Sequence, residues 1–439
     1  MDRIECTLRK WLSGLFSVLL LILLFPGKVF ALETAEEFLY NENIYYQINA
    51  LDEVVITRSR ASVKEAVIPA EIDGRPVTEI QNNAFQSRTR LTTVSLPDTI
   101  QRIGDYAFYQ CTRLETVEIP DTVTQIGWGI LAGTPWLENQ PEGCVIMGNQ
   151  ILIGYRGSDS QVVIPEGTTA IAGRAFEDCE SLMSVSIPST VTEIGGLAFS
   201  GCSKLTECTI PEGVVSLGEY AFNWCIALQT AEIADSVAAI GNHAFVGCSS
   251  LISVKLPSKL TRIESAVFLG CSNLTKVQIP DTVTDIGSDA FYGCLSLREV
   301  TLRSTVRSIG ARAFGECTSL EKLTIFNDSC QISDSAETIA ASSAIYGLRG
   351  STAQTYAQTY ERQFMIAEPV PGDVNENGLI EIADASRILL LYAQVGANLI
   401  SAPGAYELLA GDMNGDGILD ISDATQVLLI YARKGAGLE

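Results

Sequence analysis

A 23-residue period runs through the middle of this 439-residue chain and constrains its fold more than any other feature. Aligned segments follow one another at 23-residue intervals, apart from one interval of 45 residues that carries an insertion from about 136 to 161. The segments start at Val94, Val117, Val162, Val185, Cys208, Ala231, Val254, Val277, Val300 and Leu323. One short unit cannot bury its own apolar face, but stacked units bury a shared core. The period therefore predicts a repeat solenoid.

Each position in the repeat has its own physical role. The Leu-x-x-Val-x-Ile segment predicts a short strand with its apolar side chains facing the core. The Pro that follows in most copies ends the strand, because it has no amide hydrogen to continue a ladder. An Ile-Gly pair then predicts a tight or left-handed turn at the glycine. An Ala-Phe pair follows, and one large ring per coil predicts a continuous aromatic stack.

Eight of the cysteines share one repeat position, which predicts a column of small buried thiols. They are Cys111, Cys179, Cys202, Cys225, Cys248, Cys271, Cys294 and Cys317. Disulfides between neighbouring coils are the alternative. Zinc binding is disfavoured because the chain has one histidine, His243. Cys144, Cys208 and Cys330 lie off the column, and the pattern leaves their state open.

The repeat resembles the BspA-like leucine-rich repeats of bacterial surface proteins. The unit Val-x-Ile-Pro-x-x-Val-x-x-Ile-Gly-x-x-Ala-Phe-x-x-Cys-x-x-Leu carries this resemblance over about residues 43–365. It implies a leucine-rich-repeat-like solenoid with a parallel β-sheet and short turns or helices. The repeats would span 66–365, with a lead-in or cap at 32–65 and a closing cap at 323–365.

The N-terminus predicts secretion. Arg3, Arg9 and Lys10 precede an apolar run at 11–25, and a small-x-small site ends at Ala31, so residues 1–31 fit a cleaved signal peptide. An uncleaved anchor is the alternative, although the run is shorter than the roughly 20 residues that span a bilayer. No other stretch predicts a membrane span. The net charge of −23 argues against nucleic-acid binding, which needs Lys and Arg for the phosphates.

After a short linker at 366–371, two near-identical 12-residue loops predict two calcium sites. Calcium takes oxygen ligands, and such loops supply them at positions 1, 3, 5, 7, 9 and 12. The first loop offers Asp373, Asn375, Asn377, the Leu379 carbonyl, Glu381 and Asp384. The second offers Asp412, Asn414, Asp416, the Ile418 carbonyl, Asp420 and Asp423. Asn377 stands where the second loop has Asp416, so we expect the first site to bind calcium more weakly.

Position 12 is Asp rather than Glu in both loops, and an entering helix before each loop is not expected. With these features residues 372–437 resemble a type I dockerin, a small all-α calcium-binding module that binds cohesin domains of cellulosome scaffoldins. The resemblance implies partner contacts at Ile382, Ala383, Leu389, Leu390, Ile421, Ser422, Leu428 and Leu429. Leucine pairs stand where well-known members often carry basic residues, which favours an apolar interface. The alternative is that both sides of each helix pack inside the module.

No catalytic constellation is evident, and we expect His243 to be an exposed variable residue. The main hypothesis is a secreted, non-catalytic accessory protein of a polysaccharide-degrading assembly, held outside the cell through a scaffoldin. A cryptic glycoside hydrolase and a cell-surface or host-adhesion protein are the alternatives. Exposed strand positions are the candidate surface for a protein or glycan ligand: Glu207, Thr209, Thr230, Glu232, Ser253, Lys255, Lys276, Gln278, Glu299, Thr301 and Lys322.

Overall fold

The computed structural model describes residues 36–376 and 379–436, so the predicted signal peptide lies outside the described residues. Contacts divide the chain into residues 1–38 and one compact unit at 39–439. Strand β1 (Phe38–Tyr40) opens the described chain, and all later elements belong to the second unit. None of the helices in the described ranges combines the length and apolar character that a membrane crossing requires.

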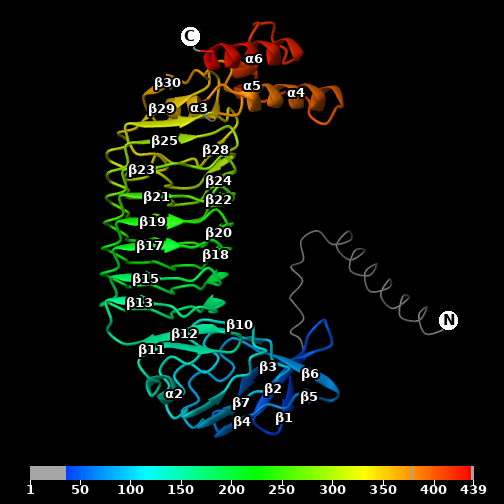
Figure 1. Ribbon diagram of the computed structural model, residues 1–439, viewed down its shortest axis with the longest axis vertical. Helices are drawn as coiled ribbons and strands as arrows, with labels where there is room; N and C mark the ends of the chain where they lie inside the picture. Colours follow the sequence, from blue (N-terminus) through cyan, green and yellow to red (C-terminus); the bar gives the residue numbers. More distant parts are fainter. Residues whose placement is uncertain (1–35, 377–378, 437–439) are drawn as a thin grey trace, which may run out of the picture. The chain divides into compact units, whose positions relative to one another are not determined.

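The predicted strand of each repeat forms, and strands of successive coils pair in parallel (Figure 1). This first series gives four sheets, ordered β4-β7-β9, β13-β15, β17-β19-β21-β23 and β25-β27-β29-β30. Its strands are β4 (Glu65–Val67), β7 (Thr93–Ser95), β9 (Thr116–Glu118), β13 (Gln161–Val163), β15 (Ser184–Ser186), β17 (Glu207–Ile210), β19 (Thr230–Ile233), β21 (Ser253–Lys255), β23 (Lys276–Val277), β25 (Glu299–Leu302), β27 (Lys322–Ile325), β29 (Ala344–Gly347) and β30 (Phe364–Ile366). The predicted parallel solenoid is confirmed.

A second series of two-residue strands, which the repeat pattern did not predict, forms at the residues just before the repeat glycine. Its members are β8 (Arg102–Ile103), β10 (Gln125–Ile126), β14 (Ala170–Ile171), β16 (Glu193–Ile194), β18 (Ser216–Leu217), β20 (Ala239–Ile240), β22 (Arg262–Ile263), β24 (Asp285–Ile286), β26 (Ser308–Ile309) and β28 (Gln331–Ile332). They also pair in parallel with neighbouring coils, as in Ile286 beside Ile309. Each coil therefore contributes to two sheets.

The role predicted for the repeat glycine is wrong in one respect. Gly241 is not in the left-handed region; a Cβ there would instead lie 2.6 Å from the amide nitrogen of Glu219 in the preceding coil. Glycine is needed because the two backbones approach closely. The left-handed turn falls two residues later, as at Tyr106, Leu197 and His243, whose φ angles are 55°, 60° and 62°.

The phenylalanines form the predicted stack along the core. Neighbouring ring centroids from Phe176 to Phe314 lie 5.0 to 5.7 Å apart, and all these rings are fully buried. The coil with Ile130 and Leu131 has no ring, but Tyr155 from the insertion stacks on Phe176 at 5.2 Å. The insertion thus extends the stack that begins at Phe176 by one ring.

The cysteines in the described chain are free thiols, as predicted for the column. Seven thiols donate a hydrogen bond to a phenylalanine carbonyl one coil earlier, and Cys248 to Phe222 is typical at 3.1 Å. Cys208 and Cys330, whose state the pattern left open, are also buried free thiols, and Cys144 is half-buried. The column satisfies a core carbonyl in each of seven coils without disulfides.

Shorter segments complete the array. β2 (Ile44–Ile48) and β3 (Val54–Ser59) form an antiparallel hairpin, and β5 (Glu71–Ile72) pairs with β6 (Arg75–Ile80), which joins β3 to the second series. The insertion forms a helix, α2 (Pro135–Glu138), and an antiparallel hairpin of β11 (Gly143–Met147) and β12 (Ile151–Arg156). Helix α3 (Thr352–Thr359) lies in the predicted closing cap.

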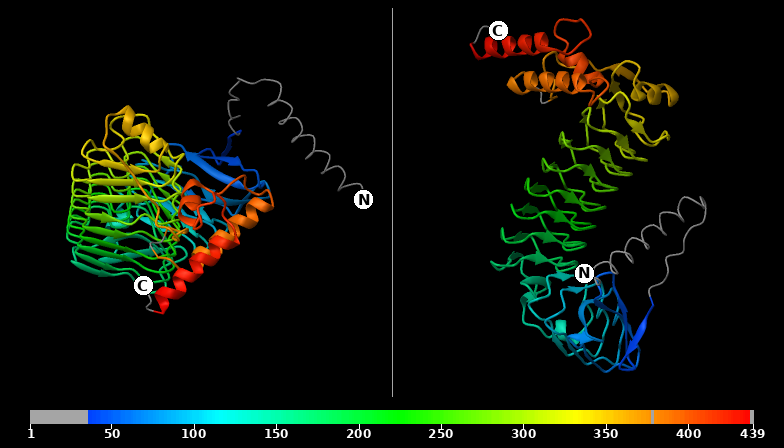
Figure 2. Two further views of the ribbon diagram at one scale, coloured as in Figure 1. Left: turned by 90° about the horizontal axis from the view of Figure 1, so that it is seen from above. Right: turned by 90° about the vertical axis from the view of Figure 1, so that its right-hand side faces the viewer.

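The C-terminal module is built from helices in the described residues, and the predicted all-α dockerin domain stays a prediction. It consists of α4 (Ile382–Gly396), α5 (Ala405–Gly411) and α6 (Ile421–Gly435). Its core gathers Ile388 and Leu391 of α4, Tyr406 of α5 and Val427 of α6. Leu348 of the repeat array belongs to the same buried cluster, so the module packs on the end of the array. Figure 2 shows the three helices beyond the last coils.

Candidate docking site on the C-terminal helices

Helices α4 and α6 each expose an apolar face beside a buried one. Ile388 and Val427 are fully buried, whereas the pairs Leu389-Leu390 and Leu428-Leu429 are 40 to 53% exposed. The other predicted partner contacts, Ile382, Ala383, Ile421 and Ser422, are also exposed. The alternative in which both sides of each helix pack inside the module is therefore wrong. Eight predicted contact positions lie on accessible surface.

The start of each long helix is fixed by the carboxylate at position 12 of its loop. Asp384 is fully buried and accepts hydrogen bonds from the amides of Asn375 and Glu381, at 3.0 and 2.8 Å. Asp423 is buried in the same way and accepts from the amides of Met413 and Asp420, at 2.9 and 3.0 Å. Both carboxylates close a capping box with the residue before the helix. The two sequence copies thus share one local design.

The second loop closes around the carboxylate of Asp412. Its Oδ1 accepts from the amides of Gly415 and Asp416, at 2.7 and 3.0 Å, and its Oδ2 accepts from Gly417 at 2.8 Å. The amide of Asp416 also lies 2.9 Å from Asn414 Oδ1. Helix α5 ends directly before this loop, so the expectation that no entering helix precedes it is wrong.

The predicted ligands of the second loop all offer oxygen donors, which suits calcium. Asp420 Oδ1 accepts from the Ser422 amide at 2.7 Å, and Ile418 is exposed at the loop surface. Within residues 36–376 and 379–436, however, no three His, Cys, Asp or Glu side chains are grouped as a metal site requires. The donor chemistry fits the ion, and calcium binding stays a prediction.

The first loop differs because one of its residues is engaged with the repeat array. Glu376, at position 4, is buried and accepts hydrogen bonds from the amide and hydroxyl of Ser304. Burial raises the pKa of the Glu376 carboxyl, and the Ser304 hydrogen bonds partly oppose this. Glu376 has a φ of 61°, where the second loop has Gly415 at 76°. Asn377 lies outside the described residues.

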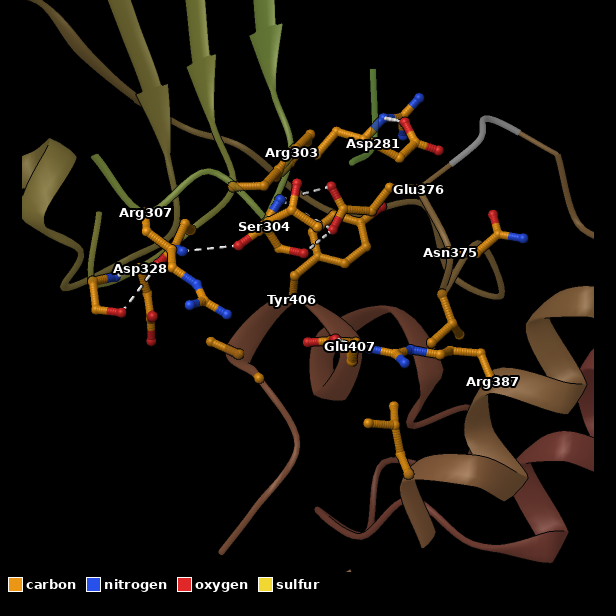
Figure 3. A pocket seen from close by; sticks show the side chains of 18 of the residues that line it. Asp281, Arg303, Ser304, Arg307, Asp328, Asn375, Glu376, Arg387, Tyr406 and Glu407 are labelled. Atoms are coloured by element: carbon orange, nitrogen blue, oxygen red, sulfur yellow. Dashed lines mark hydrogen bonds and ion pairs between the residues drawn. The ribbon is translucent and has the colours of Figure 1, made fainter. Parts of the chain in front are cut away.

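A crevice of about 660 Å³ lies beside this contact, between the last coils and the module (Figure 3). Arg303 of the array forms an ion pair with Asp281, and Arg387 of α4 pairs with Glu407 of α5 at 3.0 Å. These pairs place two of the three arginines that line the crevice beside carboxylates, and Arg307 is the third. The crevice is therefore a polar seam between the array and the module, with its charges largely compensated.

Tyr406 joins the module to the array at the base of this seam, and the sequence pattern did not single it out. Its hydroxyl donates to the Asp373 carbonyl at 3.2 Å, and its ring meets Phe326 edge-on with centroids 4.8 Å apart. Burial raises the pKa of Tyr406. Neither Tyr406 nor Phe326 belongs to a sequence motif, so their contact is evident only in the structure.

His243 is half-buried rather than exposed, which corrects the prediction. Its ring stacks on that of Tyr220 at 4.5 Å, because both residues occupy the same position in adjacent coils. The candidate ligand-binding positions of the strands, in contrast, are all exposed: Glu207, Thr209, Thr230, Glu232, Ser253, Lys255, Lys276, Gln278, Glu299, Thr301 and Lys322.

Paired parallel strands, a phenylalanine stack and a 23-residue period define a leucine-rich-repeat solenoid. The family model "BspA type Leucine rich repeat region" matches residues 76–140, 155–274 and 238–339, in six copies. These segments cover more than half of the chain, which belongs to this family of BspA-type leucine-rich repeat proteins. The match ends before the C-terminal module, so the dockerin resemblance stays a prediction.

Solved structures similar to the chain are also leucine-rich repeat proteins. A leucine rich cell surface protein from Faecalibacterium prausnitzii is 25% identical, with a TM-score of 0.30, over 70% of this chain and 97% of that one. For proteins from Bacteroides ovatus and Eubacterium ventriosum, identity is 25% and 22% and the TM-score is 0.35 and 0.40. The two alignments cover 75% and 70% of this chain, and 99% and 95% of the respective relatives' chains. The search of curated proteins found no significant match.

Proposed function

We propose that this chain is a non-catalytic, extracellular repeat protein that attaches to a scaffold through its C-terminal module. The module would use the exposed faces of α4 and α6 to bind a cohesin-type receptor domain. The observation that carries the proposal is the duplicated leucine pair, Leu389-Leu390 and Leu428-Leu429, which is exposed in both copies. Clusters of solvent-exposed apolar side chains on a helix face are typical of partner-binding surfaces.

Calcium would make this docking conditional. The oxygen atoms of Asp412, Asn414, Asp416, Asp420 and Asp423 would hold the ion in the second loop, with the Ile418 carbonyl. A bound ion would neutralise the loop carboxylates and fix the start of α6. The exposed face of α6 begins at Ile421, which is the first residue of the helix and position 10 of the loop, so the loop and the face overlap.

The test uses the full chain and a panel of immobilised cohesin domains, with calcium or with a chelator. Leu428→Asp/Leu429→Asp and Leu389→Asp/Leu390→Asp place charges on each face in turn. Leu399→Asp is the matched control, because Leu399 is 74% exposed and lies between the helices. We expect binding in calcium only, a loss of at least tenfold in one or both face variants, and no change in the control.

Binding that is equally strong in chelator, or that survives both pairs of substitutions, contradicts the proposal. Failure of every cohesin in the panel contradicts the scaffold assignment. Isothermal titration of calcium into Asp412→Ala and Asp384→Ala variants tests the metal separately. The proposal requires the second loop to bind more tightly than the first, so Asp412→Ala should remove the stronger site.

Surface adhesion through the repeat array is the second candidate function. Its support is the exposed strand face, where Glu232, Lys255 and Gln278 stand on neighbouring coils and are accessible. Solenoids commonly bind partners on such extended faces. Binding of the full chain to immobilised host matrix proteins, unchanged by chelator and by the α4 and α6 substitutions, would favour adhesion over docking.

A further inference from the structure

The first series of strands is interrupted where the insertion enters the array. Strand β9 (Thr116–Glu118) ends the sheet β4-β7-β9, and the next strand of the series, β13, belongs to a different sheet. Strand β11 of the inserted hairpin ends the sheet that continues through β12 and β14. Within the described chain, β9 and β11 each pair on one side only. Such edges present backbone N–H and C=O groups that can pair with another chain.

A cleft of about 810 Å³ lies between these two strand edges. Residues of β9 line one part of it and residues of β11 line another. Its apolar lining includes Val117 and Val145, which are buried, and Trp136, Ile146 and Met147, which are half-buried. No backbone hydrogen bond between β9 and β11 closes the cleft in the described residues.

The cleft has an acidic rim. Asp98, Glu118, Asp121 and Glu142 line it, and all four are exposed. No Lys, Arg or His belongs to its lining, and none of the ion pairs in the described chain involves these carboxylates. The rim therefore favours a cationic ligand.

We propose that this cleft receives an extended basic peptide from another protein, which adds as a β-strand along β9 or β11. The strand edges supply backbone pairing, the apolar lining accepts alternate side chains, and the rim carboxylates face Lys or Arg on the others. β11 has five residues, so the paired segment would contain about five residues and be on the order of 16 Å long. This site is separate from the docking faces of α4 and α6.

The test uses the full chain and a labelled eight-residue peptide of alternating Val and Lys. Three outcomes are expected: saturable binding by fluorescence anisotropy, slower hydrogen exchange at β9 and β11, and a change in tryptophan fluorescence from Trp136. A peptide of alternating Val and Glu is the charge control. A Val-Lys peptide with methyl groups on alternate backbone nitrogens is the strand control, because it cannot complete the ladder. Both controls should bind at least tenfold more weakly.

The double variant Glu118→Lys/Glu142→Lys should weaken binding of the Val-Lys peptide by about tenfold or more and favour the Val-Glu peptide. Both residues are exposed, and circular dichroism checks that the fold is kept. The same double change at Glu166 and Glu212, which are exposed and lie outside the cleft, is the matched control. The proposal is overturned by no binding at millimolar peptide, by equal binding of the methylated peptide, or by equal losses in both double variants.

Discussion

The repeat array and the C-terminal module are stabilised in different ways. In the array most coils repeat the same contacts, so one ring, one thiol and one close-approach glycine recur along the core. In the module two copies of a loop and helix share one small core, and one copy is also bound to the array through Glu376. Repetition distributes stability over neighbours, whereas the module depends on a few contacts that occur once.

The two halves of the module also differ in whether they contact the array. The loops match in sequence and both cap their helices through a buried aspartate. Yet position 4 is a buried glutamate in the first loop and an exposed glycine, Gly415, in the second. The first loop is therefore part of the seam with the array, and the second is accessible. A sequence duplication does not ensure that both copies have the same surroundings.

The largest expected contrast between array and module is in alkaline solution. Burial raises the pKa of the thiols, to about 11 for Cys111 and about 12 for Cys317, from an ordinary value near 9.0. Unfolded thiols ionise from about pH 8.5, so above that the unfolded chain binds fewer protons than the folded one. The contribution of the buried thiols to the free energy of unfolding is therefore complete below pH 8.5. It is lost as pH rises, by up to about 1.4 kcal/mol per thiol and pH unit.

Urea unfolding followed by tryptophan fluorescence at pH 7.5 and 9.5 measures this loss in the array. The module, which has no cysteine, should keep its hydrogen-exchange protection over the same range. A Cys225→Ala/Cys248→Ala variant should show a shallower pH dependence than the parent chain. An identical dependence would mean that the column does not contribute.

Removal of one ring from the stack should have the next largest effect. Phe245→Ala leaves a cavity between Phe222 and Phe268 and should cost about 3–5 kcal/mol. Hydrogen exchange should rise mainly in the adjacent coils, because each coil contacts only its neighbours. Ile388→Ala in the module should cost about 2–5 kcal/mol and leave the central coils protected. Uniform loss of protection along the whole chain in either variant would contradict the comparison.

A methyl group at a repeat glycine should be less costly but still clear. Gly241→Ala places Cβ 2.6 Å from the Glu219 nitrogen, and the resulting overpacking should cost about 1–3 kcal/mol. The matched change in the module, Gly396→Ala, meets no atom within 4 Å and lies in a helix. It should be neutral or stabilise by up to about 1 kcal/mol. Equal denaturation midpoints for the two variants would show that coil spacing does not restrict this position.

The array could be predicted from the sequence because the same physical demand recurs in each copy. Ala-Phe and Cys stand out when they repeat every 23 residues, and the structure places them in the core. The second strand series was not predicted because a strand of two residues, such as Asp285–Ile286, is too short to show alternation of polar and apolar side chains. Tyr155 was missed because it fills the phenylalanine position from inside an insertion.

In the module the loops and helix faces could be predicted, because both copies repeat them. The contact with the array could not be predicted from the sequence. Ser304 and Glu376 are 72 residues apart, occur once, and belong to no shared pattern. From the sequence alone, a charged residue at position 4 of a loop is expected to be exposed. The partner of Glu376 is the backbone amide and hydroxyl of Ser304, and neither group marks that serine as unusual in the sequence.

The smallest expected effect concerns this contact between module and array. Glu376→Gln keeps the shape of the side chain but removes its charge, so the hydrogen bonds from Ser304 weaken and stability should fall by about 1 kcal/mol. Ser304→Ala should cost a similar amount, and the double variant should cost less than the sum, with a coupling of about 0.5–1 kcal/mol.

Glu368→Gln, a change at an exposed carboxylate near the module, is the control and should lie within about 0.5 kcal/mol of the parent chain. Hydrogen exchange of the Ser304 amide should rise in Glu376→Gln while the amides of α6 stay protected, because the second half of the module does not depend on this contact. Additive costs, or an unchanged Ser304 amide, would show that the module is held to the array by the apolar contacts of Leu348, Phe326 and Tyr406 alone.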